Sequence, residues 1–285
     1  VQKIQEETGS FLQIVNFNVR GRQYSVTGEI KALDRLAEML EHQNHSTKKA
    51  YIEVPGIDVP FHSTLLTKGV PAFRKALEEA FPPSIDPNQL INRYLPNLTA
   101  TVFQLTPEYV REILSVVDSK PLKDVLQNWE TLIQTPNQLA RTILIELLAW
   151  QFASPVRWIE TQEVMFASPK RGGLGIHEII EIGSGQQPTL ANMAKYSLSL
   201  QGVPSEIQVF NIEADQTQIF CVETEPVVSA PVENEDETAT ETKTIVETNP
   251  TPNPIPPPQN TTLTDRPLSH SDGLSFLICM QANIR

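Results

Sequence analysis

Hydrophobic and polar positions alternate near the start of the chain and then recur at helical spacing. The alternation predicts two short strands over 11–18 and 23–28, with a turn at Arg20-Gly21 between them. A helix is predicted next from apolar residues three and four positions apart: Ile30, Leu33, Leu36, Ala37 and Leu40. Tyr51–Val54 has the composition of a third strand. Strand, strand, helix, strand in this order predicts an α+β unit over 1–58, most simply a ferredoxin-like subdomain or part of one.

Longer helical patterns follow Pro60. They predict helices over Pro71–Phe81, Pro107–Val117 and Thr135–Phe152, and a strand over Ile91–Asn97. Further on, a buried strand over Ile176–Ile182, a glycine turn at Gly183-Ser184-Gly185 and a helix over Pro188–Ser199 are expected, then strands over Ile207–Asn211 and Ile219–Val222. Strand, glycine turn and helix together are typical of α/β proteins. We therefore assign 59–222 to a second, larger α/β part with a helical insertion.

The composition changes sharply after residue 222. Residues 223–268 are rich in Pro, Thr, Glu and Asn, and such a segment buries too little apolar surface to offset its chain entropy, so it is interpreted as an acidic linker. An apolar pattern resumes at Leu274 and predicts a helix, assigned to the start of a further domain over 269–285. The chain begins at Val1 and ends within this pattern, which suggests a piece of a longer protein.

The charge distribution narrows the possible partners. The formal net charge is −12, and nine acids against two bases within 223–266 account for most of it. With no basic stripe, neither nucleic acid nor an anionic membrane surface is an expected partner. Cys221 and Cys279 are the only cysteines and lack disulfide or zinc spacing, so a reducing, cytoplasmic setting is expected. No run of about 18 apolar residues predicts a membrane span.

Several phrases resemble one enzyme family in the family's own order. They are Val15-Asn16-Phe17-Asn18, Val59-Pro60-Phe61-His62-Ser63, Trp150 to Trp158 and Glu181-Ile182-Gly183-Ser184-Gly185. Across 11–222 the chain resembles the acyl-CoA:carrier-protein acyltransferases. Within them it is most similar to the malonyl/palmitoyl transferase domain of type I fatty-acid synthases, of the actinobacterial single-chain and fungal β-subunit kinds. Phrases that narrow the match include Gly56 to Ser63, Arg93 to Leu98 and Glu146 to Phe152.

The resemblance implies a fold, a site and partners. The fold would be α/β, with a ferredoxin-like small subdomain beside the C-terminal part of a larger, hydrolase-like acyltransferase subdomain. The linker would lead to an acyl carrier domain that begins in 269–285. The substrates would be malonyl-CoA, acyl-CoA and the carrier's phosphopantetheine, with other synthase domains as partners. No cofactor would be bound by this segment.

The same resemblance assigns roles to particular residues. His62 would be the base that takes a proton from a nucleophilic serine, and its Nδ1–H would donate to a backbone carbonyl at or beside Gln151. Phe61 would be a wall of the acyl pocket that favours unbranched malonyl groups, and Asn16 and Asn18 would line the cleft. Each also has a structural alternative: a satisfied core histidine, a core phenylalanine, and turn or strand-end asparagines.

The nucleophile is not found in this sequence. No G-x-S-x-G motif occurs, and Ser184, between two glycines, lacks that spacing and is assigned to a turn. The serine and the arginine that would bind a malonyl carboxylate are expected upstream. Two other classes stay open: a non-catalytic α/β interaction or scaffold module with an acidic tail, and an α/β hydrolase that passes the acyl group to water.

Overall fold

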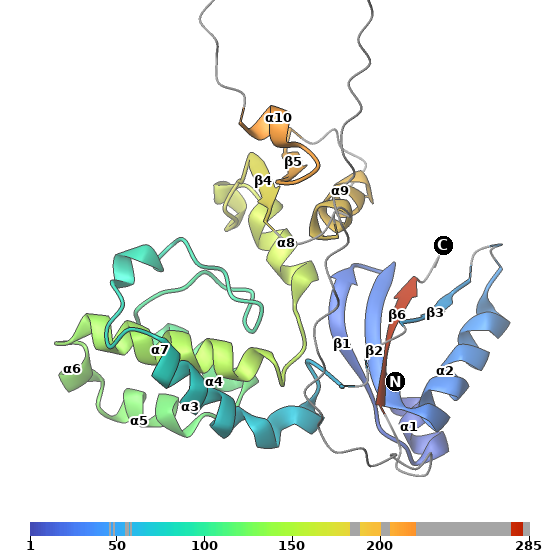
Figure 1. Ribbon diagram of the computed structural model, residues 1–285, viewed down its shortest axis with the longest axis horizontal. Coiled ribbons are helices and arrows are strands. Elements are labelled where there is room, and N and C mark those ends of the chain that lie inside the picture. Colours follow the sequence, from blue (N-terminus) through green and yellow to red (C-terminus); the bar gives the residue numbers. More distant parts are fainter. Residues whose placement is uncertain are drawn as a thin grey trace, which may run out of the picture.

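The computed structural model describes residues 1–45, 47, 49–54, 57, 59–182, 189–200 and 206–220, and the backbone of 275–281. A sheet with two helices is followed by a group of helices and then by a smaller α/β group (Figure 1). The predicted mixed α/β class is confirmed. The predicted linker over 223–268 and glycine turn over 183–185 lie outside the described residues.

The first group is built around an antiparallel hairpin, as the alternating pattern predicted. β1 (Leu12–Val19) pairs with β2 (Gln23–Glu29), and α2 (Ile30–Gln43) and β3 (Tyr51–Glu53) follow. An additional helix, α1 (Gln2–Thr8), packs beside α2 (Figure 1). Their shared core consists of Ile4, Leu12, Val26, Ala32, Leu33 and Leu36. The element order matches the prediction, whereas the ferredoxin-like assignment stays a prediction.

Gly28 allows the ends of this hairpin to approach closely. It lies opposite Leu12 in the β1–β2 register. A Cβ atom at position 28 would lie 2.6 Å from the carbonyl oxygen of Phe11 and 2.7 Å from Cδ1 of Leu12. Only glycine fits without a shift of the backbone.

The predicted C-terminal helix is wrong. Residues Ser275–Gln281 form strand β6, which lies between β2 and β3 and is antiparallel to both, so the sheet order is β1-β2-β6-β3. The edges of β2 and β3 both present backbone N–H and C=O groups, and a strand between them satisfies these groups where a helix cannot. Assignment of 269–285 to a carrier domain stays a prediction.

The second group contains the three predicted long helices. They are α3 (Val70–Ala80), α4 (Pro107–Val116) and α7 (Pro136–Gln151), joined by α5 (Lys120–Gln127), α6 (Trp129–Leu132) and the short 3₁₀ helices η1 (Thr64–Gly69) and η2 (Pro87–Gln89). Their core gathers buried side chains from α4, α5 and α7 with Leu98 and Phe103. Thr106 caps α4, since its Oγ1 accepts a hydrogen bond from the Tyr109 N–H at 3.2 Å.

The strand predicted over 91–97 is wrong. The Ile91 N–H donates to the Pro87 carbonyl at 2.8 Å, and the Tyr94 N–H donates to the Leu90 carbonyl at 2.9 Å, so the segment is a series of turns. Asn92 has a φ of 60°, in the left-handed region that strands do not use. The apolar residues that suggested a strand pack against the helical core instead.

The third group is α8 (Trp158–Phe166), the short 3₁₀ helix η3 (Pro169–Arg171), β4 (Glu178–Glu181), α9 (Leu190–Leu200), β5 (Gln208–Asn211) and α10 (Gln216–Ile219), with β4 parallel to β5. β4 was expected to be buried, but Ile180 is 39% exposed. Leu190 was expected to point inward and is also exposed, whereas Ala194 and Leu198 are buried.

The last predicted strand, over 219–222, is wrong where the structure describes it, because Ile219 ends α10. The residues before α10 form a turn, in which Oδ1 of Asn211 accepts the N–H groups of Glu213 and Ala214, both at 3.0 Å. In the part of the chain that is described, no helix combines the length and hydrophobicity that a bilayer crossing requires.

Candidate functional site

His62 occupies a tight turn against the C-terminal end of α7. Its backbone N–H donates to the Phe152 carbonyl at 2.7 Å, and the next residue, Ser63, is fully buried with its Oγ donating to the Pro60 carbonyl at 2.7 Å. The φ of His62 is 63°, an uncommon value for a residue other than glycine. Hydrogen bonds at residues 62 and 63 therefore hold the backbone of His62 in a conformation that is unfavourable by itself.

The predicted side-chain hydrogen bond of His62 is present. Nδ1 lies 2.8 Å from the backbone carbonyl oxygen of Gln151. A carbonyl oxygen only accepts, so Nδ1 carries the proton and Nε2 of the neutral ring carries the lone pair. Nε2 makes no hydrogen bond to another described residue, and the ring is only half-buried. This imidazole is oriented so that it can accept a proton at Nε2.

The His62 turn is also tied to β1. Oε1 of Gln13 accepts hydrogen bonds from both the N–H and the hydroxyl of Thr64, each at 3.0 Å. On the other side, the Val156 N–H donates to the Val15 carbonyl at 2.8 Å. The first strand, the histidine turn and the end of α7 thus meet at one place, which no pattern in the sequence indicated.

The other predicted site residues are placed as follows. Phe61 precedes the histidine and is 47% exposed, so it is not a core residue. Asn16 is half-buried on β1 and pairs with Val156 in an isolated parallel bridge. Asn18 is buried, and its amide donates to the Ser25 hydroxyl at 3.3 Å. Neither asparagine forms a hydrogen bond to His62, and the roles of all three residues in an acyl pocket stay predictions.

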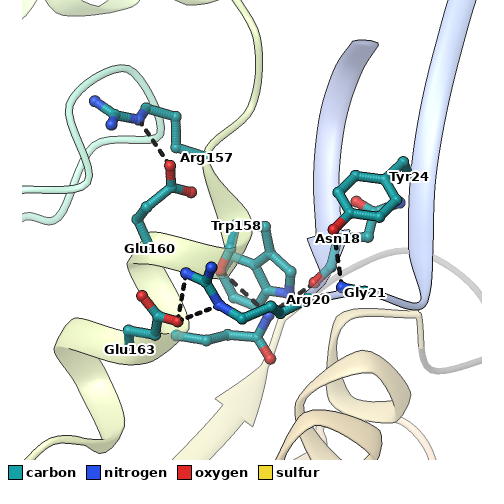
Figure 2. Close-up of polar contacts among 9 residues, drawn as sticks. Asn18, Arg20, Gly21, Tyr24, Arg157, Trp158, Glu160 and Glu163 are labelled. Atoms are coloured by element: carbon teal, nitrogen blue, oxygen red, sulfur yellow. Dashed lines mark hydrogen bonds and ion pairs between the residues drawn. The ribbon is translucent and has the colours of Figure 1, made fainter. Parts of the chain in front are cut away.

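A cavity of about 300 Å³ lies beside the far end of β1, between α8 and α9. Val19, Ile159, Phe166 and Leu200 supply apolar walls, and Gln162 lines it as well. Figure 2 shows the polar side of this region, where Arg20 forms an ion pair with Glu163 at 2.7 Å and Arg157 forms one with Glu160 at 3.3 Å.

Gln162, which lines this cavity, joins α8 to β1. Its Nε2 donates to the Asn18 carbonyl at 2.9 Å, while its Oε1 has no hydrogen-bond partner among the described residues. The side chain is almost fully buried. This hydrogen bond fixes the position of α8 on the hairpin, and the sequence offered no signal for it.

Glu181 lies where the family-like phrase 181–185 begins, and its role in the structure is to cap α9. Its carboxylate accepts the N–H groups of Leu190 at 2.8 Å and Ala191 at 3.2 Å, and the side-chain amide of Asn211 at 3.0 Å. Partial burial raises the pKa of this carboxyl, but these donors together outweigh burial, so the pKa lies below its usual value. The negative carboxylate of Glu181 also stabilises the N-terminus of α9, which is the positive end of the helix dipole.

The described part of the chain contains no group of three or more His, Cys, Asp or Glu side chains placed to hold a metal ion. Near His62, the described residues bring together an oriented imidazole, a strand, a helix end and an exposed aromatic ring.

Comparison with known proteins identifies the class. No family model matches the chain. Fatty acid synthase 2 of Mycosarcoma maydis is 34% identical over 233 residues, covering 70% of this chain and 6% of that protein. The fatty acid synthase beta subunit TOXC of Cochliobolus carbonum is 36% identical over 163 residues, and the fatty acid synthase subunit beta of Saccharomyces cerevisiae is 30% identical over 172 residues. The matches to TOXC and to the Saccharomyces cerevisiae subunit each cover 46% of this chain and 8% of the relative.

These relatives are fatty acid synthase proteins, and the chain is homologous to them. More particularly, it is a homologue of fungal fatty acid synthase β subunits, which confirms the resemblance recognised in the sequence. The chain spans less than a tenth of the length of these relatives.

Proposed function

We propose that this chain is the C-terminal part of a synthase acyltransferase that moves malonyl and acyl groups between CoA and an acyl carrier protein. One observation carries the proposal: the Nδ1–H of His62 is bonded to the Gln151 carbonyl at 2.8 Å, which leaves Nε2 free to accept a proton. Homology to fatty acid synthase subunits, which are enzymes, supports it. Fatty acid biosynthesis is thus the setting in which the site would work.

In the proposed reaction, a serine from outside this chain attacks the thioester carbonyl of an acyl-CoA while Nε2 of His62 takes the hydroxyl proton. The tetrahedral intermediate collapses, the carbon–sulfur bond breaks, and the CoA thiolate takes that proton from the imidazolium. The phosphopantetheine thiol of the carrier then gives its proton to Nε2 and attacks the serine ester. The thioester forms, and the proton returns to the serine oxygen.

The Gln151 carbonyl has a specific part in this scheme. It keeps Nδ1 protonated, so the neutral ring always presents Nε2 as the acceptor. When the imidazolium forms, the same carbonyl dipole stabilises its charge without requiring a buried carboxylate. The site would therefore work as a serine–histidine dyad with a neutral third group.

Substrate selection is assigned to the residues that flank the imidazole. Phe61 lies next to His62 and is exposed. As the family resemblance implies, its ring would leave no room for an α-methyl branch. Asn16 and Asn18, on β1, would line the same cleft. The malonyl carboxylate would be bound by an arginine from outside this chain.

The acidic segment over 223–268 is proposed as a tether to the acyl carrier domain. A flexible linker makes delivery intramolecular, and repulsion among its nine acids would keep it extended. The cytoplasm, which the sequence led us to expect, is the proposed location of this synthase.

The decisive experiment is His62→Ala in a full-length fatty acid synthase in which this chain supplies the corresponding segment. Removal of a general base should lower malonyl transfer from CoA to pantetheine by about 10²- to 10⁴-fold. The matched control is His42→Ala, because His42 lies in the last turn of α2 and is exposed. Normal transfer by the His62 variant would make this histidine structural and overturn the proposal.

Two further measurements test where the nucleophilic serine lies and whether the protein is a transferase or a hydrolase. The chain alone should not form a serine ester with radiolabelled malonyl-CoA, and measurable acylation would overturn the division of roles. In the full-length protein, the trapped acyl-enzyme should pass its acyl group to pantetheine faster than to water. A preference for water would identify a hydrolase.

A further inference from the structure

Glu146 is a buried charge that the proposed reaction does not use. It lies in α7, with only 1% of its surface exposed, among apolar residues of the helical core. An ionised carboxylate in such a place is strongly destabilising unless charged or polar donors surround it. Its partners therefore indicate what the residue does.

Glu146 accepts hydrogen bonds from three side chains, which belong to α3, to the N-cap of α5 and to α7 itself. Arg74 of α3 bonds both carboxylate oxygens: Nε donates to Oε1, and Nη2 donates to Oε2 at 2.9 Å. Ser119, the N-cap of α5, donates from Oγ to Oε2 at 2.7 Å, and Trp150 Nε1 donates at 3.3 Å. The charge is fully satisfied, and it joins α3, α5 and α7.

The ion pair lies one helical turn beyond the junction that holds His62. α3 begins at Val70, shortly after the histidine turn, and Val70 packs on Ala149 and Ala153 at the end of α7. Phe73 packs edge-on against Phe152, with ring centroids 5.2 Å apart. These apolar contacts hold the helices together, but they define the register of one helix on the other less sharply than a directional contact does.

A bidentate contact between Arg and a carboxylate is directional and has one preferred geometry. The Arg74–Glu146 pair therefore sets how far along α7 the start of α3 lies. Both carbonyls that hold His62, those of Gln151 and Phe152, belong to the end of α7. Any slide of α3 would move the histidine turn relative to these two acceptors.

We propose that the Arg74–Glu146 ion pair is a positioning lock: it fixes the register of α3 on α7 and so keeps His62 Nδ1 on the Gln151 carbonyl. Arg74 and Glu146 are positioning residues, since neither touches the reacting atoms. The consequence for acyl transfer rests on the proposed function, whereas the effect on the imidazole does not.

The first test measures the imidazole in the full 285-residue chain. Two-bond ¹H–¹⁵N correlation spectra report the tautomer of His62, which should be Nδ1–H in the wild type. In Arg74→Met and in Glu146→Gln, we expect the Nδ1–H population of the neutral ring to fall by about half or more, because the carbonyl no longer fixes the tautomer. His62→Ala identifies the resonances.

Two further variants keep this test decisive. Leu33→Ala destabilises the separate sheet core and should leave the His62 tautomer unchanged. The double variant Arg74→Met/Glu146→Met replaces the pair with apolar side chains, which restores stability without restoring a directional contact. The lock predicts that its tautomer shifts like that of the single variants. A wild-type tautomer in a folded double variant, or an equal shift in Leu33→Ala, overturns the proposal.

The second test measures transfer in the full-length synthase described above. The double variant should lower kcat by about 10- to 100-fold, as expected for a misplaced base, with KM for malonyl-CoA within about twofold. A normal kcat overturns the lock. The two proposals can fail separately. Normal transfer by His62→Ala would refute the role of His62 as a base but would not affect the tautomer result. An unchanged tautomer would refute only the role of the Arg74–Glu146 pair.

Discussion

Phe103 is the best position at which to test the packing of the helical group. Its side chain is completely buried, and its ring packs edge-on against that of Tyr109 with centroids 5.4 Å apart. Phe103→Ala should reduce the free energy of unfolding by about 3–5 kcal/mol, the cost of lost transfer energy and the residual cavity. About 1 kcal/mol of this comes from the ring pair. Phe103→Leu keeps most of the volume and should cost about 1–1.5 kcal/mol.

Urea unfolding monitored by tryptophan fluorescence measures this loss. Trp129 and Trp150 both pack against the core that contains Phe103, so their emission reports the unfolding of this group. With a denaturant slope of about 2–3 kcal/mol/M, the midpoint should fall by about 1–2.5 M for Phe103→Ala and by about 0.5 M for Phe103→Leu.

The matched control is Val116→Ala on α4, because Val116 belongs to the same group and is 39% exposed. Its midpoint should stay close to that of the wild type. If Phe103→Ala also unfolds at the wild-type midpoint, the segment that carries Phe103 does not pack on the helices, and the fold described for it is wrong.

Three other predictions follow from local geometry and charge. Glu181→Gln should lower the free energy of unfolding by roughly 1 kcal/mol at pH 7, after allowance for solvent screening. Because the folded-state pKa of Glu181 is lowered, this difference should shrink as the pH falls below 4.5 and should be lost once the folded-state carboxylate is protonated. Gly28→Ala should destabilise the chain by about 1–3 kcal/mol, since its Cβ would meet the Phe11 carbonyl at 2.6 Å. Shortening 223–266 in the full-length synthase should reduce fatty acid formation more than transfer to free pantetheine, because only the former needs carrier delivery.

Each of these has a clear opposing result. A stability loss in Glu181→Gln that is as large at pH 3 as at pH 7 would show that packing, rather than charge, holds α9. Wild-type stability of Gly28→Ala would mean that the β1–β2 ends are not in contact. Equal losses of synthesis and transfer in the shortened protein would remove the delivery role of the linker. Urea unfolding at both pH values, and parallel assays of the two activities, measure these outcomes.

Local periodicity predicted much of the fold, for a physical reason. α2 and α4 bury one face each, so their apolar residues repeat at helical spacing, and α4 starts with a visible signal, Pro107 after the Thr106 cap. α7 is buried on several sides, since residues 143–147 are all buried, and its long apolar run predicted a helix. Alternation predicted β1 and β2, and alternate residues of both strands do contribute to one core: Leu12 and Ile14, Tyr24 and Val26. The pattern did not show that residues 25–28 of β2 are buried on both faces. Such patterns are written in neighbouring residues and need no knowledge of the rest of the chain.

Apolar runs without a decisive period were assigned incorrectly. Ile91 and Tyr94 suggested a strand but lie in turns that pack on the helical core. Leu277, Ile278 and Met280 suggested a helix but pair as a strand. A short apolar segment can bury its side chains either way, and the available backbone partners decide between them. Those partners lie far away in the sequence.

The candidate site divides in the same way. The identity of His62 and its bond near Gln151 were foreseen from a family resemblance in consecutive residues. The anchoring of the histidine turn by Gln13 and the pairing of Arg74 with Glu146 were not, because each joins residues from separate elements.

By itself, the sequence determined the first hairpin and the long helices, the mixed α/β class, the acidic composition of 223–268 and the presence of one histidine within a family-like phrase. Only the tertiary structure decided that Gln13 anchors the histidine turn and that a buried carboxylate on α7 pairs with Arg74 of α3. Side-chain periodicity is a local property, whereas hydrogen-bond partners and the pairing of buried charges depend on which distant segments the folded chain brings together.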